Sequence, residues 1–316
     1  MLKTAICDLF GIKHPIIQGG MAHVGTVELV SAVSNAGGLG IIGAGHYEPD
    51  WVRQQIRLTR ERTTKPFGLN IPLTSPFAEP VVQVALEEKI AIIATGAGNP
   101  DAYMPRFKRA GMKVIPVVAS VAVAKHLEQA GADAIVAEGM ESGGHVGETT
   151  TIALVPQVVD SVRIPVVAAG GIADGRGLAA ALALGAQGVQ MGTRFVLSTE
   201  CIAHPQYKQK LLEADDQATL VTRQSVGRPL RTLRNKLAEQ VIELEKAGIA
   251  KEELELFDRG RMYLGLIEGD IDDGSLLAGQ IAGMIKEIKP VKAIIEEMVA
   301  EAEKIIKNLR NFRREG

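Results

Sequence analysis

Short apolar runs alternate with longer amphipathic segments along this sequence, and the alternation limits the folds that the chain can adopt. Eight runs end in glycine or small polar residues, and each is apolar on both faces, as a strand covered on both sides must be. These runs are residues 15–20, 39–45, 67–73, 91–98, 113–120, 133–139, 164–171 and 188–198. The segments between them predict helices over residues 26–38, 49–63, 79–89, 100–111, 121–132, 149–162 and 175–186. This repeat favours a TIM (β/α)8 barrel over a doubly wound sheet, which shows the same alternation.

The pattern changes after about residue 203. Strong strand signals are missing from there on, and helix-like runs cover residues 231–248 and 274–288, followed by a charged tail from Lys289. We expect a catalytic, cofactor-binding barrel over residues 1–202. Residues 203–316 are expected to form a helical extension, packed on the barrel mouth and available for contact in a homodimer.

Composition excludes several functional classes. The chain carries 35 basic and 37 acidic residues, so no overall field attracts nucleic acid or a membrane surface. No apolar run approaches the roughly 20 residues of a membrane-spanning helix. Cys7 and Cys201 are too few for a disulfide framework or a metal cluster. The N-terminus lacks the pattern of a signal peptide, and we expect a cytoplasmic protein.

Glycine-rich segments follow the seventh and eighth predicted strands. They read AAGGIADGRG over residues 168–177 and QMGTRF over residues 190–195. TIM barrels often bind phosphate at these two loops, where backbone N–H groups must be free of side chains. The candidate phosphate-binding residues are Gly170, Gly171, Gly192 and Thr193. Asp174 is expected to cap the helix that follows. The alternative is that the glycines only turn the chain.

Polar groups also end the earlier strands, at Gln18 and Met21, at Asn70 and at Thr95. Side-chain amides at strand ends can bind a flat heteroaromatic ring. A ring with a phosphate tail across a barrel mouth suggests FMN. Residues 38–43, GLGIIG, match the dinucleotide-binding pattern of glycines, but they follow a helix and lie inside a strand, which argues against that function.

One histidine, His145, lies in the segment EGMESGGHVGETTT that follows the sixth predicted strand. Its small neighbours leave space for a substrate, and imidazole titrates near neutral pH, so His145 is a candidate acid or base. The alternative is a solvated side chain. Among the other histidines, only His23 is a candidate for touching the site.

The chain resembles the FMN-dependent family that joins enoyl-acyl-carrier-protein reductase II and nitronate monooxygenase, formerly 2-nitropropane dioxygenase. The resemblance rests on QGGMA, AGGLGIIGAG, KPFGLNI, TGAGNP, VIPVVAS, AEGMESGGHVGETTT, PVVAAGGIADGRG, QMGTRF and GDIDDGSLLAGQIAGM. It covers nearly the whole chain. The segments AEGMESGGH and GSLLAGQ are most similar to the reductase branch.

This resemblance implies that FMN lies over the C-terminal face of the barrel and that His145 is the catalytic residue. The implied cofactor-binding residues are Gln18, Gly19, Gly20, Met21, Asn70, Glu138, Gly170, Gly171, Gln190, Gly192 and Thr193. Ser142 and Gly144 would contact the substrate. No metal-ligand set is expected, although a monovalent cation near the extension is a candidate. The acidic residues from Asp270 to Asp273 are expected to form a solvated turn rather than a calcium loop.

For a reductase, the resemblance implies that NADH or NADPH reduces FMN, which passes hydride to an enoyl thioester on acyl carrier protein in fatty acid synthesis. Arg194, Lys208 and Arg223 are candidates for docking that acidic partner. The first alternative is a nitronate monooxygenase that oxidises nitronates or nitroalkanes with oxygen. The second is a flavin- or phosphate-binding barrel without turnover.

Overall fold

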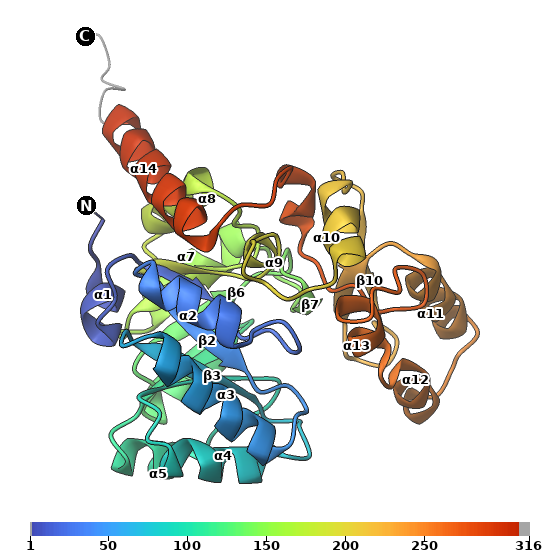
Figure 1. The fold of residues 1–316 in the computed structure, drawn as a ribbon, viewed down its shortest axis with the longest axis horizontal. Coiled ribbons are helices and arrows are strands. Elements are labelled where there is room, and N and C mark those ends of the chain that lie inside the picture. Colours follow the sequence, from blue (N-terminus) through green and yellow to red (C-terminus); the bar gives the residue numbers. More distant parts are fainter. Residues whose placement is uncertain (1, 310–316) are drawn as a thin grey trace.

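The computed structural model describes residues 2–309, and among these residues eight parallel strands close into a barrel (Figure 1). The strands are β1 (Ile16–Gln18), β2 (Leu39–Gly43), β3 (Phe67–Pro72), β4 (Ile92–Gly96), β5 (Lys113–Val118), β6 (Ile135–Glu138), β8 (Val166–Ala169) and β9 (Gly188–Met191). They pair in chain order, and Ile17 of β1 lies opposite Leu39 on one side and Gln190 on the other. The predicted TIM barrel is confirmed.

The predicted helices between the strands are also confirmed. They are α2 (Val27–Asn35), α3 (Pro49–Arg62), α4 (Ala78–Glu87), α5 (Met104–Arg109), α6 (Val121–Gln129), α7 (Thr151–Ser161) and α8 (Gly175–Ala183). Asp174 caps α8 as expected, since its side chain accepts a hydrogen bond from Arg176 N at 3.0 Å. The last predicted strand was too long, because the chain turns at Gly192 into the short helix α9 (Thr193–Val196).

Alternating side chains of the strands build two apolar layers, as the twofold period of a strand requires. Ile41 belongs to the cluster inside the barrel, whereas its neighbour Ile42 belongs to the cluster between the strands and the helices. The short helix α1 (Ala5–Phe10) adds Ile6 and Phe10 to the inner cluster. Burial of each such side chain contributes about 1.5–3 kcal/mol.

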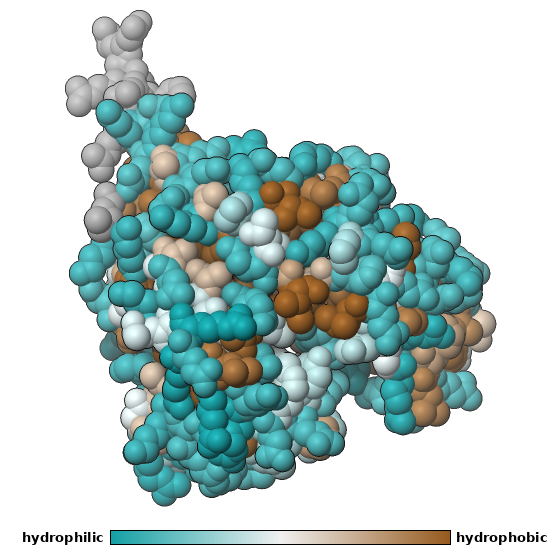
Figure 2. All heavy atoms as spheres, in the orientation of Figure 1, coloured by the Kyte–Doolittle hydropathy of each residue, from teal (hydrophilic) through white to brown (hydrophobic). Residues whose placement is uncertain are grey.

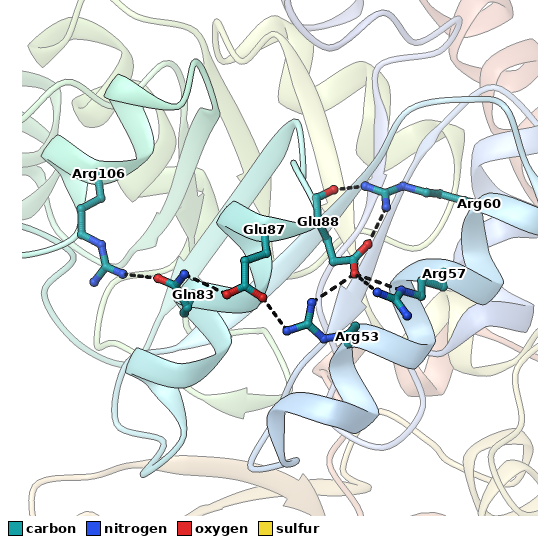
Figure 3. A network of polar contacts seen from close by, with 7 residues as sticks. All are labelled: Arg53, Arg57, Arg60, Gln83, Glu87, Glu88 and Arg106. Carbon is teal, nitrogen blue, oxygen red and sulfur yellow. Dashed lines mark hydrogen bonds and ion pairs between the residues drawn. The ribbon is translucent and has the colours of Figure 1, made fainter.

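A network of arginine and glutamate side chains joins α3 to the end of α4 (Figure 3). The carboxylate of Glu88 is 9% exposed and accepts hydrogen bonds from Arg53, Arg57 and Arg60 at distances of 2.8–3.2 Å. Arg53 also pairs with Glu87 at 2.6 Å. These contacts hold the neighbouring barrel helices α3 and α4 together.

Residues 199–288, here called the cap, leave the barrel after α9. Their helices are α10 (Pro205–Leu212), α11 (Lys236–Lys246), α12 (Lys251–Asp258), α13 (Arg261–Leu266) and the 3-10 helix η1 (Gln280–Met284). The expectation of a purely helical extension was wrong. Strands β10 (Thr219–Thr222) and β11 (Leu230–Leu233) form an antiparallel hairpin, and β11 pairs with β7 (Gly144–His145). Strands of two to four residues are too short to give a clear alternation in the sequence.

The tail of the chain returns to the barrel as helix α14 (Val291–Leu309), which packs against α8 and α2 (Figure 1). The N–H of Gly175 donates to Glu301 Oε2 at 2.8 Å. The two ends of the cap meet, because Thr199 N donates to Lys289 O at 3.1 Å. The division at residue 202 stays a prediction. The residues after it first form the cap and then return as α14 to the ring of helices around the barrel.

The visible face in Figure 2 is mostly hydrophilic, with small separate hydrophobic patches. Within residues 2–309, no helix is both long and apolar enough to cross a lipid bilayer. Cys7 and Cys201 are buried and free, and no group of metal-ligating side chains is found in the described part of the chain.

Candidate active site

A cavity of about 440 Å³ lies at the C-terminal ends of the barrel strands, with part of its wall made by the cap. The predicted site residues that line it are Gly19, Gly20, Met21, Asn70, Glu138, Ser142, Gly144, His145, Gly170, Gly171, Gln190, Gly192 and Thr193. The cap contributes Tyr207, Leu266, Leu277, Gly279 and Ile281. Sequence reasoning assigned no role to these cap residues. Leu277, Gly279 and Ile281 lie within the segment GDIDDGSLLAGQIAGM, which could have pointed to them, whereas no motif marks Tyr207 and Leu266.

Gln18 is an exception among the predicted cofactor contacts. Its side chain is fully buried and does not line the cavity. Its Oε1 accepts from Ile41 N at 3.1 Å and its Nε2 donates to Ile41 O at 3.2 Å, so the amide joins β1 to β2. Thr95 likewise lies outside the cavity wall, 1% exposed.

The loop after β8 has the backbone that a phosphate cradle requires. Gly170 and Gly171 have φ angles of 87° and 72°, in the left-handed region that favours glycine. A Cβ atom on Gly170 would lie 2.8 Å from Gly139 O, so a side chain does not fit there. Backbone amides in such a turn can bind an anion. None of the described lining residues is a lysine or an arginine, so a phosphate bound here would depend on backbone amides rather than on a cationic side chain.

His145 is held by backbone pairing with the cap rather than by a free loop. It lies opposite Leu230 of β11, and the next residue, Val146, donates its N–H to Pro229 O at 3.1 Å. The side chain is exposed toward the cavity. The surrounding protein still removes water, and this desolvation, followed by the positive charges of Arg228 and Arg223, lowers the pKa of His145. A neutral imidazole results, with one nitrogen that donates and one that accepts.

Glu138 ends strand β6 beside this histidine loop. Burial raises the pKa of its carboxyl to about 7, against the opposing effect of the nearby Ser142 hydroxyl. No cationic side chain pairs with Glu138 in the described chain. The cavity therefore holds a carboxylic acid that keeps its proton to unusually high pH, a property that the sequence motif did not predict.

The basic residues predicted to dock an acidic partner are all buried. Lys208 Nζ donates to Ser198 O at 2.7 Å and to Cys201 O at 2.6 Å. Arg223 forms an ion pair with Asp258, and Arg194 donates to Leu197 O at 2.8 Å. The docking prediction for these three residues was therefore wrong.

Three other features noted in the sequence, His23, the GLGIIG segment and the acidic residues from Asp270, make local contacts that support the fold. His23 lies outside the cavity wall, with Nδ1 2.7 Å from the Tyr47 hydroxyl. Within the GLGIIG segment, a Cβ on Gly40 would lie 2.2 Å from Val30 O, so this glycine permits helix packing. Asp270 accepts hydrogen bonds from the N–H groups of two following residues, which forms the expected acidic turn.

Comparisons with known proteins identify the family of the chain. The nitronate monooxygenase family model matches residues 3–84 and 76–301. A probable nitronate monooxygenase of Staphylococcus saprophyticus is 36% identical, over 77% of this chain and 82% of its own. The (3aS,4S,5R,7aS)-5-hydroxy-7a-methyl-1-oxo-octahydro-1H-indene-4-carboxyl-CoA dehydrogenase of Mycobacterium tuberculosis is 34% identical, over 95% of this chain and 96% of its own. The structure of FabK from Thermotoga maritima is 51% identical, covers 99% of this chain and 100% of its own, and superposes with a TM-score of 0.97. The chain therefore belongs to the nitronate monooxygenase family of oxidoreductases.

Proposed function

We propose that this enzyme is an FMN-dependent enoyl-acyl-carrier-protein reductase that uses NADH or NADPH. FabK is an enoyl-acyl-carrier-protein reductase II. The observation that carries the proposal is the 51% identity to FabK over 99% of the chain. The probable nitronate monooxygenase is 36% identical over 77% of the chain. The Mycobacterium relative is named for a coenzyme A thioester, which supports a thioester as the substrate class.

The cavity supports FMN as the cofactor, with the backbone amides of Gly170 and Gly171 holding its phosphate. When bound, FMN supplies the hydride-transfer chemistry between the reduced nicotinamide and the double bond. Asn70 and Gln190 line the same cavity and offer amide groups to a flat ring.

His145 carries the acid–base work in this proposal. Its neutral imidazole donates a hydrogen bond to the thioester carbonyl, which draws electron density away from the β-carbon. A proton must also reach the α-carbon, and His145 faces the cavity where that carbon would lie. Gly143 and Gly144 leave space for the thioester beside the ring.

The decisive experiment mixes FMN-loaded protein with NADH in the absence of oxygen and then adds a crotonyl thioester. We expect rapid bleaching of the flavin absorption band, followed by its recovery after the thioester is added. The same mixture is repeated with NADPH, and a flavin band that both NADH and NADPH leave unchanged would refute the reductase proposal.

Nitronate monooxygenase is the second candidate, favoured by the family model and by the curated relative. The lowered pKa of His145 suits a base that removes a proton from a nitroalkane. In the same experiment, a flavin absorption band that NADH leaves unchanged and a nitronate bleaches would favour this activity. Acyl carrier protein as partner and the homodimer stay predictions.

A further inference from the structure

We propose that Glu141 and Thr151 are positioning residues that tie the segment carrying His145 to the glycine loop at residues 170–171. They act through contacts with the backbone of both segments and not by touching the reacting atoms. The activity readout below rests on the proposed function, whereas the exchange readout does not.

Thr151 is the first residue of α7 and is 9% exposed. Its N–H lies 2.9 Å from both carboxylate oxygens of Glu141. Its hydroxyl lies 2.9 Å from Glu141 Oε2, 3.0 Å from Gly170 O and 3.2 Å from Ala169 O. A hydroxyl has one proton to donate, so it shares that proton among acceptors from two different loops. Thr151 therefore stands between the histidine segment and the glycine loop.

Glu141 extends the connection to the cap. Its backbone carbonyl accepts from Gln280 N at 2.9 Å. The preceding carbonyl, of Met140, accepts from Arg231 Nε at 3.1 Å. Arg231 is 4% exposed and lies opposite Gly144 in the pairing of β11 with β7. The backbone just before His145 is thus held from the barrel side and from the cap side.

The packing around these contacts leaves little space for independent movement. A Cβ atom on Gly139 would lie 2.0 Å from Thr151 Oγ1 and 2.5 Å from Glu141 Oε2. A Cβ on Gly171 would touch Glu141 Cβ at 3.5 Å. Segments packed this closely move together, since an interior at native density transmits displacement. We therefore expect occupation of the glycine loop to order the segment around His145.

Amide hydrogen exchange tests this coupling, measured in residues 139–147 and 166–173 of the flavin-free and the FMN-loaded protein. Thr151→Val removes the hydroxyl and keeps the shape, and should raise exchange in both segments about 5-fold, the change that one net hydrogen bond produces. Thr151→Ser keeps the hydroxyl and should return the exchange rates of both segments to wild-type values. Thr59→Val is the matched control, because the buried Thr59 hydroxyl donates to Gln55 O at 2.7 Å on α3.

A rise in only one of the two segments, or an equal rise in Thr59→Val, would overturn the proposal. If Thr151→Val does not fold, Glu141→Gln takes its place, since it keeps one oxygen for the N–H of Thr151 and should again raise exchange in both segments. These measurements need no turnover, so they stand even if the proposed reductase activity fails.

Steady-state kinetics with NADH and a crotonyl thioester give the second readout. In Thr151→Val, kcat should fall about 10-fold or more while KM stays within about 3-fold, because a displaced acid–base group affects the reaction step more than substrate binding. Thr151→Ser should recover most of kcat. An increase of KM at unchanged kcat would contradict a positioning role.

Discussion

Replacement of Glu138 by glutamine should stabilise the flavin-free protein at high pH. The carboxyl has an ordinary pKa of 4.5, and burial raises it to about 7 in the fold. The folded state therefore binds this proton more tightly than the unfolded chain does. The contribution of Glu138 to stability is fully present below pH 4.5 and is lost as pH rises through about 7.

The full difference between those two pKa values corresponds to about 3.5 kcal/mol, at ~1.4 kcal/mol for each pKa unit. Glu138 lines a cavity that water can enter, which reduces the penalty, so we expect about 1–2 kcal/mol. Glu138→Gln keeps the shape and cannot ionise. The free energy of unfolding of Glu138→Gln, relative to that of the wild type, should increase by about 1–2 kcal/mol between about pH 5 and pH 8 and then stay constant.

Urea unfolding at several pH values measures this difference. Trp51 is the single tryptophan of the sequence and stacks on Tyr47 at 3.8 Å between ring centroids, so its fluorescence reports unfolding. Glu252→Gln is the matched control, because Glu252 is exposed and its charge stays hydrated in both states. A Glu138→Gln protein that is less stable than wild type at pH 8, or a gain that does not depend on pH, would refute the reasoning.

Other predictions concern single side chains. His145→Ala should keep FMN affinity within about 2-fold and reduce turnover about 100-fold or more; near-normal NADH-dependent turnover would exclude the catalytic role. Gly170→Ala should weaken FMN binding at least about 10-fold, since the left-handed backbone and the contact with Gly139 O both exclude a methyl group; flavin fluorescence titration measures this, and unchanged affinity would contradict the phosphate cradle. Glu88→Gln should lower the free energy of unfolding by about 1–2 kcal/mol without changing FMN binding, because it weakens the network with its arginine partners; an unaltered urea midpoint would mean that the network adds nothing. Burial lowers the pKa of His14 below 6.5, so the neutral form is favoured in the fold and the resulting stability is lost as pH falls below 6.5; His14→Asn should flatten the acid-side decline in unfolding free energy, and an unchanged slope would show that His14 does not contribute to it.

The barrel could be predicted from the sequence because each of its strands is buried on both faces and each is followed by a helix with its own period. The glycine turn after β8 could be predicted for a similar reason, whereas phosphate binding there stays a prediction. Glycines at residues 170 and 171 are tied to a fixed place after β8, and the backbone there has positive φ. Local sequence and barrel geometry agree at both places.

The cap could not be predicted in the same way. Strand β7 has two residues, and it exists because β11, more than 80 positions later in the chain, pairs with it. Gln18 looked like a site residue because it ends a strand, but its side-chain amide forms hydrogen bonds with the backbone N–H and carbonyl of Ile41. Contacts between distant segments determine both outcomes, and periodicity within one segment carries no information about them.

The meeting of the two ends of the cap, at Thr199 and Lys289, has a consequence for synthesis and for evolution. Helix α14 takes its place between α8 and α2 only after the whole cap has left the ribosome, so the ring of helices stays open until the last part of the chain is made. Because the cap departs and returns at adjacent backbone positions, its length and sequence can change without moving the strands. Changes in the cap can therefore alter its part of the cavity wall during evolution, while the part of the wall at the strand ends stays the same.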